Sequence, residues 1–565
     1  MERMVAPLAD WIFLSDMGCL SLLSAPGGSR GGYRRRYGEP FRGTSGGLPI
    51  SGDSLRVGEL VATLALAQDN AFGQPLESQL RSCLLAVWLA EEAGLDSDSC
   101  DTVYWVALLR YIGCTGHAHE VATLFGDEIA IRAQTLIHDA GNPEEVMADV
   151  VAFATAGKTH DEREQIIQMI DAGAHEWAVH NFQSGCEAGD MLLQRLDFGP
   201  AVRDALAHTF ERWNGKGFPN HTGGTDIPLA MRIVHISHDM EAIGRHFSPG
   251  RALEAIVDRR DRTYAPDLAD LFALHGLDWF KRLEALDPWQ SVLDLEPKPL
   301  CLLADDELDS ALAVAADFID LKSPYMAGHS RRCADLAAEA ATLLGLDAGE
   351  VQTIRRAALV HEFGTTAIPN SIWDKPGELT RSERDRVELH PLITEQMLRR
   401  SDALAALNPV AACHHERCDG SGYHKRLSAP AIIDGAHVLA AADVFVGLTA
   451  DRADRRAWSE AEAVAELRRL TSAHCLQQYA VDAVVAAIGV GDPKKLRRQN
   501  PAGLTKREVE VLRLAARGLT TQQIADELFI SPKTTDHHIQ HVYTKIGVST
   551  RAAAALWAMQ NGIVS

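Results

Sequence analysis

The segment Ala-Leu-Val-His-Glu-Phe-Gly at residues 358–364 has a counterpart 251 positions earlier, Ala-Leu-Leu-Arg-Tyr-Ile-Gly at residues 107–113. The stretches 90–95 and 340–346 are also similar, and residues 210–218 match residues 415–423 at a separation of 205. Chance similarity between helical sequences hardly produces two such matches in the same order. The sequence therefore predicts two tandem copies of one domain, with a loop of different length inside each.

Apolar residues recur every three or four positions through most of the chain, as in residues 80–91, 330–344 and 461–470. This spacing is typical of amphipathic helices, and the alternation expected of strands is scarce. We expect an all-α protein: two tandem helical bundles at 51–290 and 298–490, then a small domain at 494–565. The glycine-rich leader at 1–50 is expected to be flexible.

Length and composition limit the class of protein. A chain of 565 residues suggests three or four domains, and 46% apolar with 23% charged residues is ordinary for a globular protein. Mean hydropathy is −0.10, and no uncharged apolar run is long enough to span a membrane. The best candidate, residues 11–25, is interpreted as part of a poorly ordered leader. Ten cysteines without a Cys-x-x-Cys pair favour a reduced, cytoplasmic setting.

Charge distinguishes the last segment from the rest of the chain. Residues 494–565 carry eleven Lys and Arg against five acidic residues, a net charge of +6, and the remainder carries −28. A basic tail attracts a polyanion such as DNA, and an acidic body repels one.

Histidines and acidic residues gather in the second copy. In chain order they are His329, His361-Glu362, His390, His414-His415 and Asp443. Imidazole and carboxylate together suit iron, manganese or zinc, and a metal pair can act on a phosphodiester. A single histidine is more often a surface or core residue, so this prediction depends on order and spacing.

The second copy resembles the HD-GYP domain over residues 317–470. The motifs that carry the resemblance stand in the family's order: Met326-Ala-Gly-His-Ser330, His361-Glu-Phe-Gly364, Ile368-Pro-Asn, Lys375-Pro-Gly, Leu379-Thr, His390-Pro, His414-His-Glu-Arg-Cys-Asp-Gly-Ser-Gly-Tyr423 and Ala442-Asp-Val-Phe445. That family is an all-helical bundle with a di-iron or similar metal site. Its members hydrolyse cyclic di-GMP, and some are degenerate binding or signalling modules.

The resemblance implies roles for ten residues. The implied ligands of a divalent metal (Fe, Mn or Zn) are His329, His361, Glu362, His390, His414, His415 and Asp443, with His361, Glu362 and Asp443 carrying the catalysis. The implied contacts to the phosphates of a cyclic dinucleotide are Tyr423, Arg452 and Arg455, where guanidinium groups suit the chemistry.

Four positions depart from the family pattern. Glu362 replaces an aspartate, Thr365 a lysine, His424 a proline and Val446 an acid. The longer carboxylate keeps an oxygen ligand but alters the metal spacing, and Thr365 removes a cation from the scissile phosphate. We therefore expect metal binding to survive better than efficient turnover.

The first copy is predicted to have lost the site altogether. The residues that replace the ligands are Ser78, Arg110, Tyr111, Thr209, Phe210 and His238. This copy is interpreted as a structural or dimerising domain; the alternative is a regulatory ligand pocket.

The tail contains clear helix boundaries. Thr505 and Glu508 form a predicted capping box, Gly518 ends that helix, and Ser531-Pro532 begin another that runs to residue 546 with a polar outer face. Two short helices joined by a tight turn are typical of a helix-turn-helix.

This tail resembles the LuxR-type DNA-binding domain over nearly all of the stretch 501–565, with matching segments at 504–512, 516–518, 530–534 and 545–548. The resemblance implies a four-helix domain that places residues 531–546 in the major groove of double-stranded DNA. The implied contacts are Asp536, His537 and Gln540 to bases, and Lys533, Thr534 and Lys545 to phosphates.

Three hypotheses for the function follow. The first is a transcription regulator whose HD-type domains sense a ligand, a nucleotide, and whose tail binds DNA as a homodimer, because one such tail buries little surface. The alternative is a metal-dependent phosphohydrolase acting on cyclic di-GMP or a related phosphodiester. The third is a structural scaffold. In each case we expect no membrane association.

Overall fold

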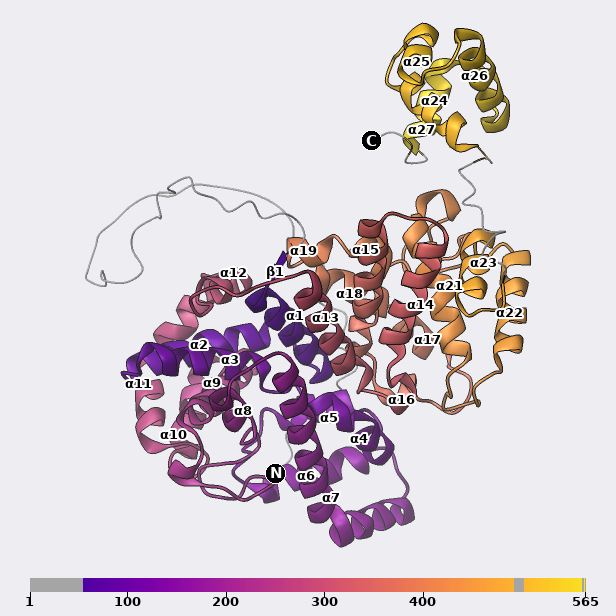
Figure 1. Ribbon diagram of the computed structural model, residues 1–565. Coiled ribbons are helices and arrows are strands. Elements are labelled where there is room, and N and C mark those ends of the chain that lie inside the picture. Colours follow the sequence, from indigo (N-terminus) through magenta and orange to yellow (C-terminus); the bar gives the residue numbers. More distant parts are fainter. Residues whose placement is uncertain (1–53, 492–501, 503, 561–562, 564–565) are drawn as a thin grey trace, which may run out of the picture. The chain divides into compact units, whose positions relative to one another are not determined.

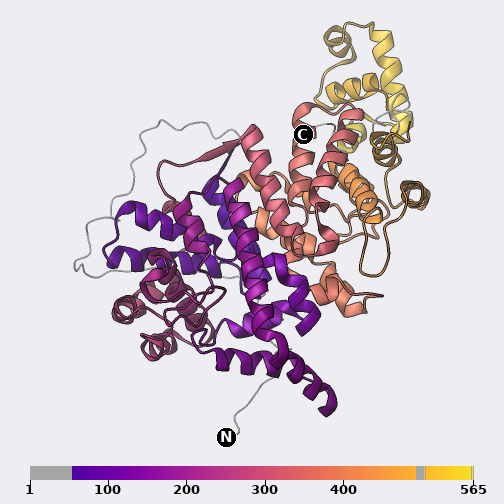
Figure 2. The same ribbon diagram turned by 60° about the horizontal axis from the view of Figure 1, so that its bottom comes forward.

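The computed structural model describes residues 54–491, 502, 504–560 and 563. The leader expected at 1–50 lies outside these residues. So does all of 492–500, where a polar, cationic composition predicts a linker. Helices dominate the described chain, and two three-residue strands form its sheet (Figures 1 and 2). The all-α prediction is confirmed. No helix among the described residues is both long and apolar enough to cross a bilayer.

The first half, as described from residue 54 onward, consists of one strand, twelve α-helices and two 3-10 turns: β1 (Ser54–Arg56), α1 (Val57–Ala71), α2 (Ser78–Glu92), α3 (Ser97–Leu109), η2 (Cys114–His117), α4 (Ala118–Phe125), α5 (Glu128–Thr135), α6 (Pro143–Ala154), α7 (His160–Arg195), α8 (Pro200–Leu206), η3 (Gly224–Asp226), α9 (Leu229–His246), α10 (Pro249–Arg259), α11 (Pro266–Glu284) and α12 (Pro288–Asp294).

The second half and the tail complete the described elements. The second half comprises β2 (Leu302–Ala304), α13 (Asp305–Asp320), η4 (Pro324–Met326), α14 (His329–Leu343), α15 (Ala348–Val360), η5 (Phe363–Ala367), α16 (Asn370–Trp373), α17 (Arg381–Val387), α18 (His390–Leu398), α19 (Asp402–Ala405), α20 (Asn408–Ala411), η6 (Ala429–Ala431), α21 (Asp434–Leu448), α22 (Glu460–Ser472) and α23 (Gln478–Ala487). The tail comprises α24 (Lys506–Ala516), α25 (Thr521–Glu527), α26 (Pro532–Ile546) and α27 (Arg551–Gln560).

The two halves repeat the same order of elements. Helices α2 and α3 precede α14 and α15 by the separation that relates the segments 107–113 and 358–364. The turn η3 and helix α9 precede η6 and α21 by the smaller separation that relates the segments 210–218 and 415–423. Helices α2, α3 and α9 and the turn η3 of the first half therefore correspond to α14, α15, α21 and η6 of the second half.

The strand pair is the one feature that the helical pattern does not anticipate. β1 and β2 run antiparallel, with Ser54 opposite Ala304, and the Cys301 carbonyl accepts a hydrogen bond from the Val57 N–H. The sequence predicts a linker at residues 297–302, but backbone pairing holds the end of this segment, because each strand supplies partners for the other's polar groups. Helix α12 also extends past the expected boundary at residue 290.

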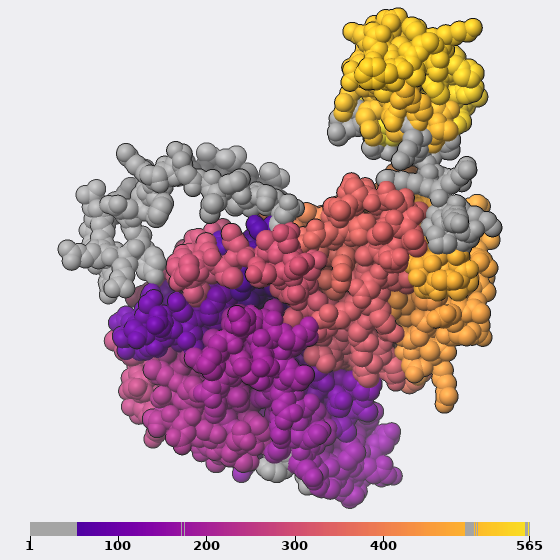
Figure 3. Space-filling view, in the orientation of Figure 1, coloured from indigo at the N-terminus to yellow at the C-terminus, as the bar shows by residue number. Residues whose placement is uncertain are grey.

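One continuous apolar core runs through residues 54–491, and Figure 3 shows how side chains fill the gaps left between ribbons. In the second half α14 packs against α15, α21 and α23, and in the first half α2 packs against α3 and α9. This packing fixes the start of α14, the end of α15 and the middle of α21, which are the places where His329, His361 and Asp443 stand.

The tail has its own apolar core, built around residues such as Leu512, Val542 and Ala558. The predicted capping box is present: Glu508 N–H donates to Thr505 Oγ1 at 3.2 Å, and Thr505 N–H donates to the Glu508 carboxylate at 2.7 Å. Ser531 caps α26 as expected. Four short helices with these boundaries match the prediction for this segment.

Candidate metal centre and DNA-binding domain

Seven histidine and carboxylate side chains converge in the second half from five separate places in the chain. His329 begins α14, His361 and Glu362 follow α15, His390 begins α18, His414 and His415 follow α20, and Asp443 lies within α21. The sequence predicts all seven, and the structure brings all seven together in two adjoining groups.

The first group is centred on His329. Its Nε2 lies 3.2 Å from Asp443 Oδ1 and 3.7 Å from Glu362 Oε1. His361 Nε2 lies 3.8 Å from the same Glu362 oxygen and 4.0 Å from the same Asp443 oxygen. Cys333 completes this group, with its Sγ 3.5 Å from His329 Nε2.

The second group is centred on His390. Its Nε2 lies 3.2 Å from His414 Nε2 and 3.5 Å from Glu362 Oε2. His415 Nδ1 lies 3.9 Å from Asp443 Oδ2. Glu362 and Asp443 thus each face the first group with one oxygen and the second group with the other, which is the arrangement of bridging carboxylates.

Backbone carbonyls fix the tautomer of three histidines. The Nδ1 atoms of His361, His390 and His414 lie 2.6, 2.7 and 2.6 Å from the carbonyl oxygens of Ala358, Val387 and Ala411. A carbonyl can only accept, so each Nδ1 carries the proton and each Nε2 presents a lone pair to the cluster. Every one of these partners lies three residues before its histidine, at the end of a helical turn.

The resulting arrangement contains unsatisfied acceptors. His361 Nε2 and Glu362 Oε2 are buried and have no hydrogen-bond partner in the part of the chain that the structure describes. The facing Nε2 atoms of His390 and His414 are then two acceptors 3.2 Å apart, which is unfavourable unless a cation or a proton lies between them. Buried lone pairs aimed at one another fit a divalent metal pair, and the donor set of nitrogen and oxygen suits iron, manganese or zinc.

Burial keeps the imidazoles of His361, His390 and His414 neutral, whereas Cys333 and the Asp443 carboxylate outweigh burial at His329 and raise its pKa well above the ordinary value. Burial lowers the pKa of His361 to about 3 and that of His390 to about 4, and it lowers the pKa of His414 well below the ordinary value. Burial raises the pKa of Glu362 to about 8. Neutral imidazoles are the form that binds a metal, and a cation would also remove the cost of the ionised Glu362 carboxylate.

The predicted phosphate-contacting residues are placed differently from one another. The Tyr423 ring lies 4.7 Å from the ring of His415, at the edge of the cluster. Arg452 lies near enough for its charge to lower the pKa of Glu362 against the effect of burial. Arg455 instead donates from Nη2 to the Gly447 carbonyl and from Nη1 to the Leu448 carbonyl, so it holds the turn after α21.

Two of the departing positions, Thr365 and His424, have their hydrogen-bond partners outside the metal-ligand side chains. Thr365 donates its hydroxyl to the Glu362 carbonyl at 2.7 Å, and His424 Nε2 lies 3.0 Å from Glu395 Oε2. Position 365 therefore brings no cation to the cluster.

Sequence reasoning missed Cys333. It follows His329 by four residues on a helix, and two side chains at that spacing lie on the same face. That spacing was the available signal.

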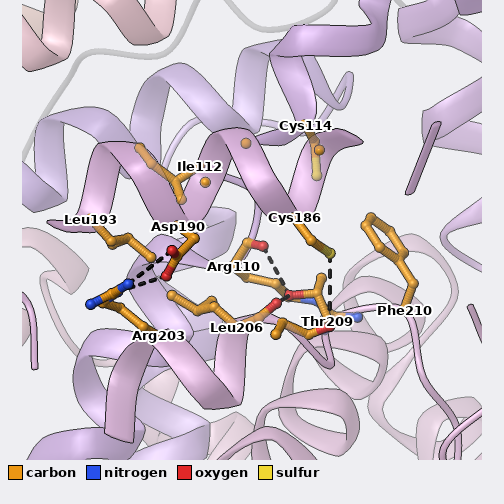
Figure 4. Close-up of a pocket in the computed structure, with 14 residues that line it drawn as sticks. Arg110, Ile112, Cys114, Cys186, Asp190, Leu193, Arg203, Leu206, Thr209 and Phe210 are labelled. Atoms are coloured by element: carbon orange, nitrogen blue, oxygen red, sulfur yellow. Dashed lines mark hydrogen bonds and ion pairs between the residues drawn. The ribbon is translucent and has the colours of Figure 1, made fainter. Parts of the chain in front are cut away.

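The corresponding place in the first half has different chemistry. Thr209 donates its hydroxyl to the Arg110 carbonyl (Figure 4). Tyr111 Oη lies 3.4 Å from His238 Nε2, and Arg110 Nη2 lies 3.8 Å from Asp239. A guanidinium has no lone pair for a metal. Among the described residues, both groups with metal-ligand spacing lie in the second half.

Helix α26 exposes the predicted DNA-contacting face. Its buried positions are Thr535, Val542 and Ile546, and its exposed positions are Lys533, Thr534, Asp536, His537, Gln540 and Lys545. Two of the exposed groups also have partners within the domain: Lys545 Nζ lies 2.6 Å from Glu508 Oε2, and Thr534 Oγ1 lies 2.7 Å from Ser531 Oγ. Trp557 packs against the core of the tail.

Comparisons with known proteins agree with this division of the chain. Residues 313–475 match the HD domain, and residues 502–558 match the luxR family of bacterial regulatory proteins. The chain is 28% identical over 418 residues to 3'3'-cGAMP-specific phosphodiesterase 3 of Vibrio cholerae, covering 73% of this chain and 90% of that protein. It is 30% identical over 318 residues to the cyclic di-GMP phosphodiesterase response regulator RpfG of Xanthomonas campestris, covering 54% of this chain and 79% of that protein.

A solved structure extends the similarity beyond the HD domain match. A cyclic GMP-AMP specific phosphodiesterase of V. cholerae superposes with a TM-score of 0.54 at 25% identity, covering 78% of this chain and 99% of that one. Coverage of that extent takes in much of the first half as well as the second.

Proposed function

Because this chain belongs to the HD-GYP-type HD-domain proteins and ends in a luxR-family domain, we propose that it is a DNA-binding transcription regulator that senses a cyclic dinucleotide. The ligand binds at the metal centre of residues 298–490, and the tail binds double-stranded DNA. The observation that carries the proposal is the set of inward-facing lone pairs in a chain that also exposes a polar recognition helix.

The seven converging side chains would hold the metal pair. One group is His329, His361 and Asp443 with Cys333, and the other is Glu362, His390, His414 and His415. When bound, two divalent ions supply Lewis acidity toward a phosphodiester. Glu362 and Asp443 each face both groups and would set the spacing between the ions.

The remaining side chains of the site orient the ligand. Tyr423 offers an aromatic edge beside His415, and Arg452 offers a guanidinium, whose planar fork suits a phosphate. Arg455 acts indirectly, since its donors already hold the carbonyls of the turn that positions Arg452.

Position 365 favours sensing over rapid turnover. Thr365 uses its hydroxyl on a backbone carbonyl and leaves the scissile phosphate without the cation that the family places there. Charge developing on that phosphate would then lack one stabilising partner, which slows the chemical step more than it weakens binding.

The tail supports recognition of DNA by two copies of the chain. One helix-turn-helix buries too little surface for tight specific binding, and two half-sites would correct this. On α27 the apolar side chains of Leu556 and Met559 are 57% and 58% exposed and stand one helical turn apart. They offer a small apolar surface for a homodimer contact.

The test measures ligand binding and product formation in one sample. The full-length protein is loaded with Mn²⁺ and titrated with cyclic di-GMP and with 3'3'-cGAMP by calorimetry, and the mixtures are then analysed by chromatography. Binding that is lost in His414→Ala/His415→Ala and kept in the control His160→Ala/His180→Ala, which removes two exposed histidines of α7, supports the proposal. Absence of binding by the unaltered protein, or full binding by the His414→Ala/His415→Ala variant, contradicts it.

A phosphodiesterase is the second candidate function. All seven predicted ligands converge, and burial keeps four of the imidazoles neutral, those of His361, His390, His414 and His415. The relatives compared above bear the names of phosphodiesterases. Linear products in the same chromatographic assay, absent from the His414→Ala/His415→Ala variant, would establish this activity.

A further inference from the structure

The two halves differ most in the segment that follows Gly113 in the first half and Gly364 in the second half. A Cβ added to Gly364 would lie 1.9 Å from the His390 carbonyl oxygen, and a Cβ added to Gly113 would lie 1.9 Å from the Gly185 carbonyl oxygen. Gly185 is therefore the counterpart of His390. The chain between Gly113 and Gly185 is much longer than the chain between Gly364 and His390, so the first half carries an insertion here.

This longer segment contains helices α4–α6 and the start of α7, and these helices line a cavity over the former metal position. Its volume is about 510 Å³, and a second cavity of about 240 Å³ adjoins it. The two share lining residues from the insertion, such as Val146 and Trp177, and Phe210, which stands where the second half has His415. A cavity of this size accommodates a small organic molecule.

The lining of the larger cavity is apolar and partly open to solvent. Leu124, Met147 and Met169 line it and are 36%, 38% and 51% exposed. An apolar ligand that covers exposed apolar groups at a cavity mouth removes them from water, which is favourable. Methionine side chains also adapt to ligands of different shapes.

Two guanidinium groups lie at the buried part of this space. Arg132 lines the smaller cavity and Arg212 lines both, and they are 8% and 5% exposed. Arg132 donates to the carbonyls of Ala71 and Cys114, and Arg212 donates to those of Thr209 and Glu211.

Neither guanidinium has a carboxylate within 4.0 Å in the described part of the chain, and Arg212 Nε has no hydrogen-bond partner there. Arg212 Nη1 also lies 3.4 Å from His235 Nε2, and Arg132 lies over the Phe72 ring. A buried cation whose contacts are all with uncharged groups is costly, so a negative ligand group would be favoured beside it.

Two further groups surround the same space. His117 lines the smaller cavity, is 6% exposed, and has an Nδ1 atom with no hydrogen-bond partner among the described residues. Burial lowers the pKa of His117 to about 3, so it is a neutral ring with a free polar atom. Asp239 also lines this cavity, but its oxygens already meet Tyr264 Oη at 3.0 Å and His238 Nδ1 at 3.3 Å. The uncommitted polar groups are therefore cationic or neutral.

We propose that the first half is a binding site for an organic monoanion with an apolar body. The body, a chain or a ring system, occupies the cavity between α4, α6 and α7, and the carboxylate lies toward Arg212, Arg132 and His117. In the first half, an apolar pocket with the Arg212 and Arg132 guanidinium groups at its buried end takes the place of the metal centre. This inference does not depend on any activity of the second half.

The test uses the full-length protein and displacement of the fluorescent probe 1-anilinonaphthalene-8-sulfonate. The competitors are decanoate and 2-naphthoate, each compared with its neutral amide, so that charge and body shape are varied separately. At least one carboxylate should bind on the order of tenfold more tightly than its amide, as expected for charge-assisted hydrogen bonds at a buried site. Which carboxylate binds distinguishes a chain from a ring.

Three variants locate the site. Arg212→Gln should bring the affinity of the carboxylate close to that of the amide, and Arg132→Gln provides the same test should the Arg212 variant unfold. Ala178→Trp, which fills the larger cavity, should weaken both ligands about tenfold or more. Arg203→Gln is the matched control, because Arg203 pairs with Asp190 and lines neither cavity (Figure 4).

Equal affinity of the unaltered protein for both carboxylates and their amides would overturn the proposal. So would carboxylate binding by Ala178→Trp that matches the unaltered protein. His414→Ala/His415→Ala should bind these ligands normally, which separates this result from any defect of the metal centre.

Discussion

The Cys333 thiol lies 3.5 Å from His329 Nε2, one turn further along α14 and inside the first group of metal-ligand side chains. Burial raises the pKa of this thiol to about 11, so it is protonated in the metal-free protein at neutral pH. A divalent cation beside it would favour the thiolate, as coordinating metals deprotonate thiols.

A cobalt spectrum tests whether Cys333 is a ligand. The Co²⁺-loaded protein should show a near-ultraviolet thiolate-to-metal charge-transfer band, which Cys333→Ser should lose while cobalt remains bound through the nitrogen and oxygen ligands. Cys83→Ser is the control, because Cys83 is equally buried but belongs to the first half. A band that persists in Cys333→Ser would exclude thiolate coordination by this residue.

Metal content should depend on the second half alone. His414→Ala/His415→Ala removes two of the four ligands of one group. The metal bound by that group, measured by plasma emission spectroscopy, should therefore be lost. Circular dichroism should change little, because His414 and His415 stand in a turn after α20 and not within a helix. Full metal retention by this double variant would refute the assignment.

Acid should destabilise the metal-free protein through the same histidines. The folded-state pKa values of His361 and His390 are about 3 and about 4, below the ordinary value of 6.5, so between these limits the unfolded chain binds more protons. Stability is then fully present above pH 6.5 and is lost as the pH falls toward 4. Glu362, with a pKa of about 8, acts in the opposite direction between pH 4.5 and 8, but it is one group against several.

The measurement is the midpoint of thermal unfolding as a function of pH. We expect the midpoint to fall between pH 6.5 and 4, and His361→Gln/His390→Gln to flatten that fall. An equally steep fall in the double variant would mean that other groups are responsible.

The sequence predicted the helical class and the tail because each leaves a local pattern. The order of the histidine and acidic residues indicated that they converge, and their role as metal ligands stays a prediction. Periodic apolar residues predict helices, and the caps at Thr505 and Ser531 predict where helices begin. The β1–β2 pair could not be predicted in this way, because it joins Arg56 to Leu302, which stand in different halves of the chain.

The orientation of side chains also required the structure. The resemblance implies that Arg455 meets a phosphate, but its guanidinium is directed to backbone carbonyls of its own turn. It also implies that Lys545 contacts DNA phosphate, and this residue pairs with Glu508 on α24 in the folded domain. Sequence specifies which residues carry charge, but the distance to a competing partner is a property of the fold.

DNA binding should be electrostatic and confined to the tail. The fragment 494–565, with a charge of +6, should bind duplex DNA with an affinity that falls steeply with salt, and residues 1–493, with −28, should not bind. Lys533→Ala should weaken binding to all sequences and reduce the salt slope by about 1. DNA binding by residues 1–493 would contradict this division.

Asp536 offers a second test on the same helix. Its exposed carboxylate faces a polyanion, so Asp536→Asn should strengthen binding to arbitrary duplexes by a factor of about 2 to 5 in fluorescence anisotropy. Asp526→Asn on α25 is the matched control, because it removes the same charge from outside α26. An equal gain in both variants would show a general charge effect in place of a position at the DNA surface.

Ligand binding at the metal centre should alter DNA affinity through dimer formation. A cyclic dinucleotide that favours the dimer-competent state should change DNA affinity by a coupling free energy of about 1–3 kcal/mol. The dimer contact is expected at Leu556 and Met559, since their exposed apolar side chains lie together on α27.

Titrating cyclic di-GMP and Mn²⁺ against DNA binding, with mass measured by analytical ultracentrifugation, tests both steps. Leu556→Asp/Met559→Asp should leave a monomer on DNA and abolish the coupling while the metal centre still binds its ligand. Leu274→Asp, which alters a leucine of α11 that is 74% exposed, should change neither. A protein that stays monomeric on DNA, with an affinity unaffected by the nucleotide, would remove the gating mechanism and leave DNA binding intact.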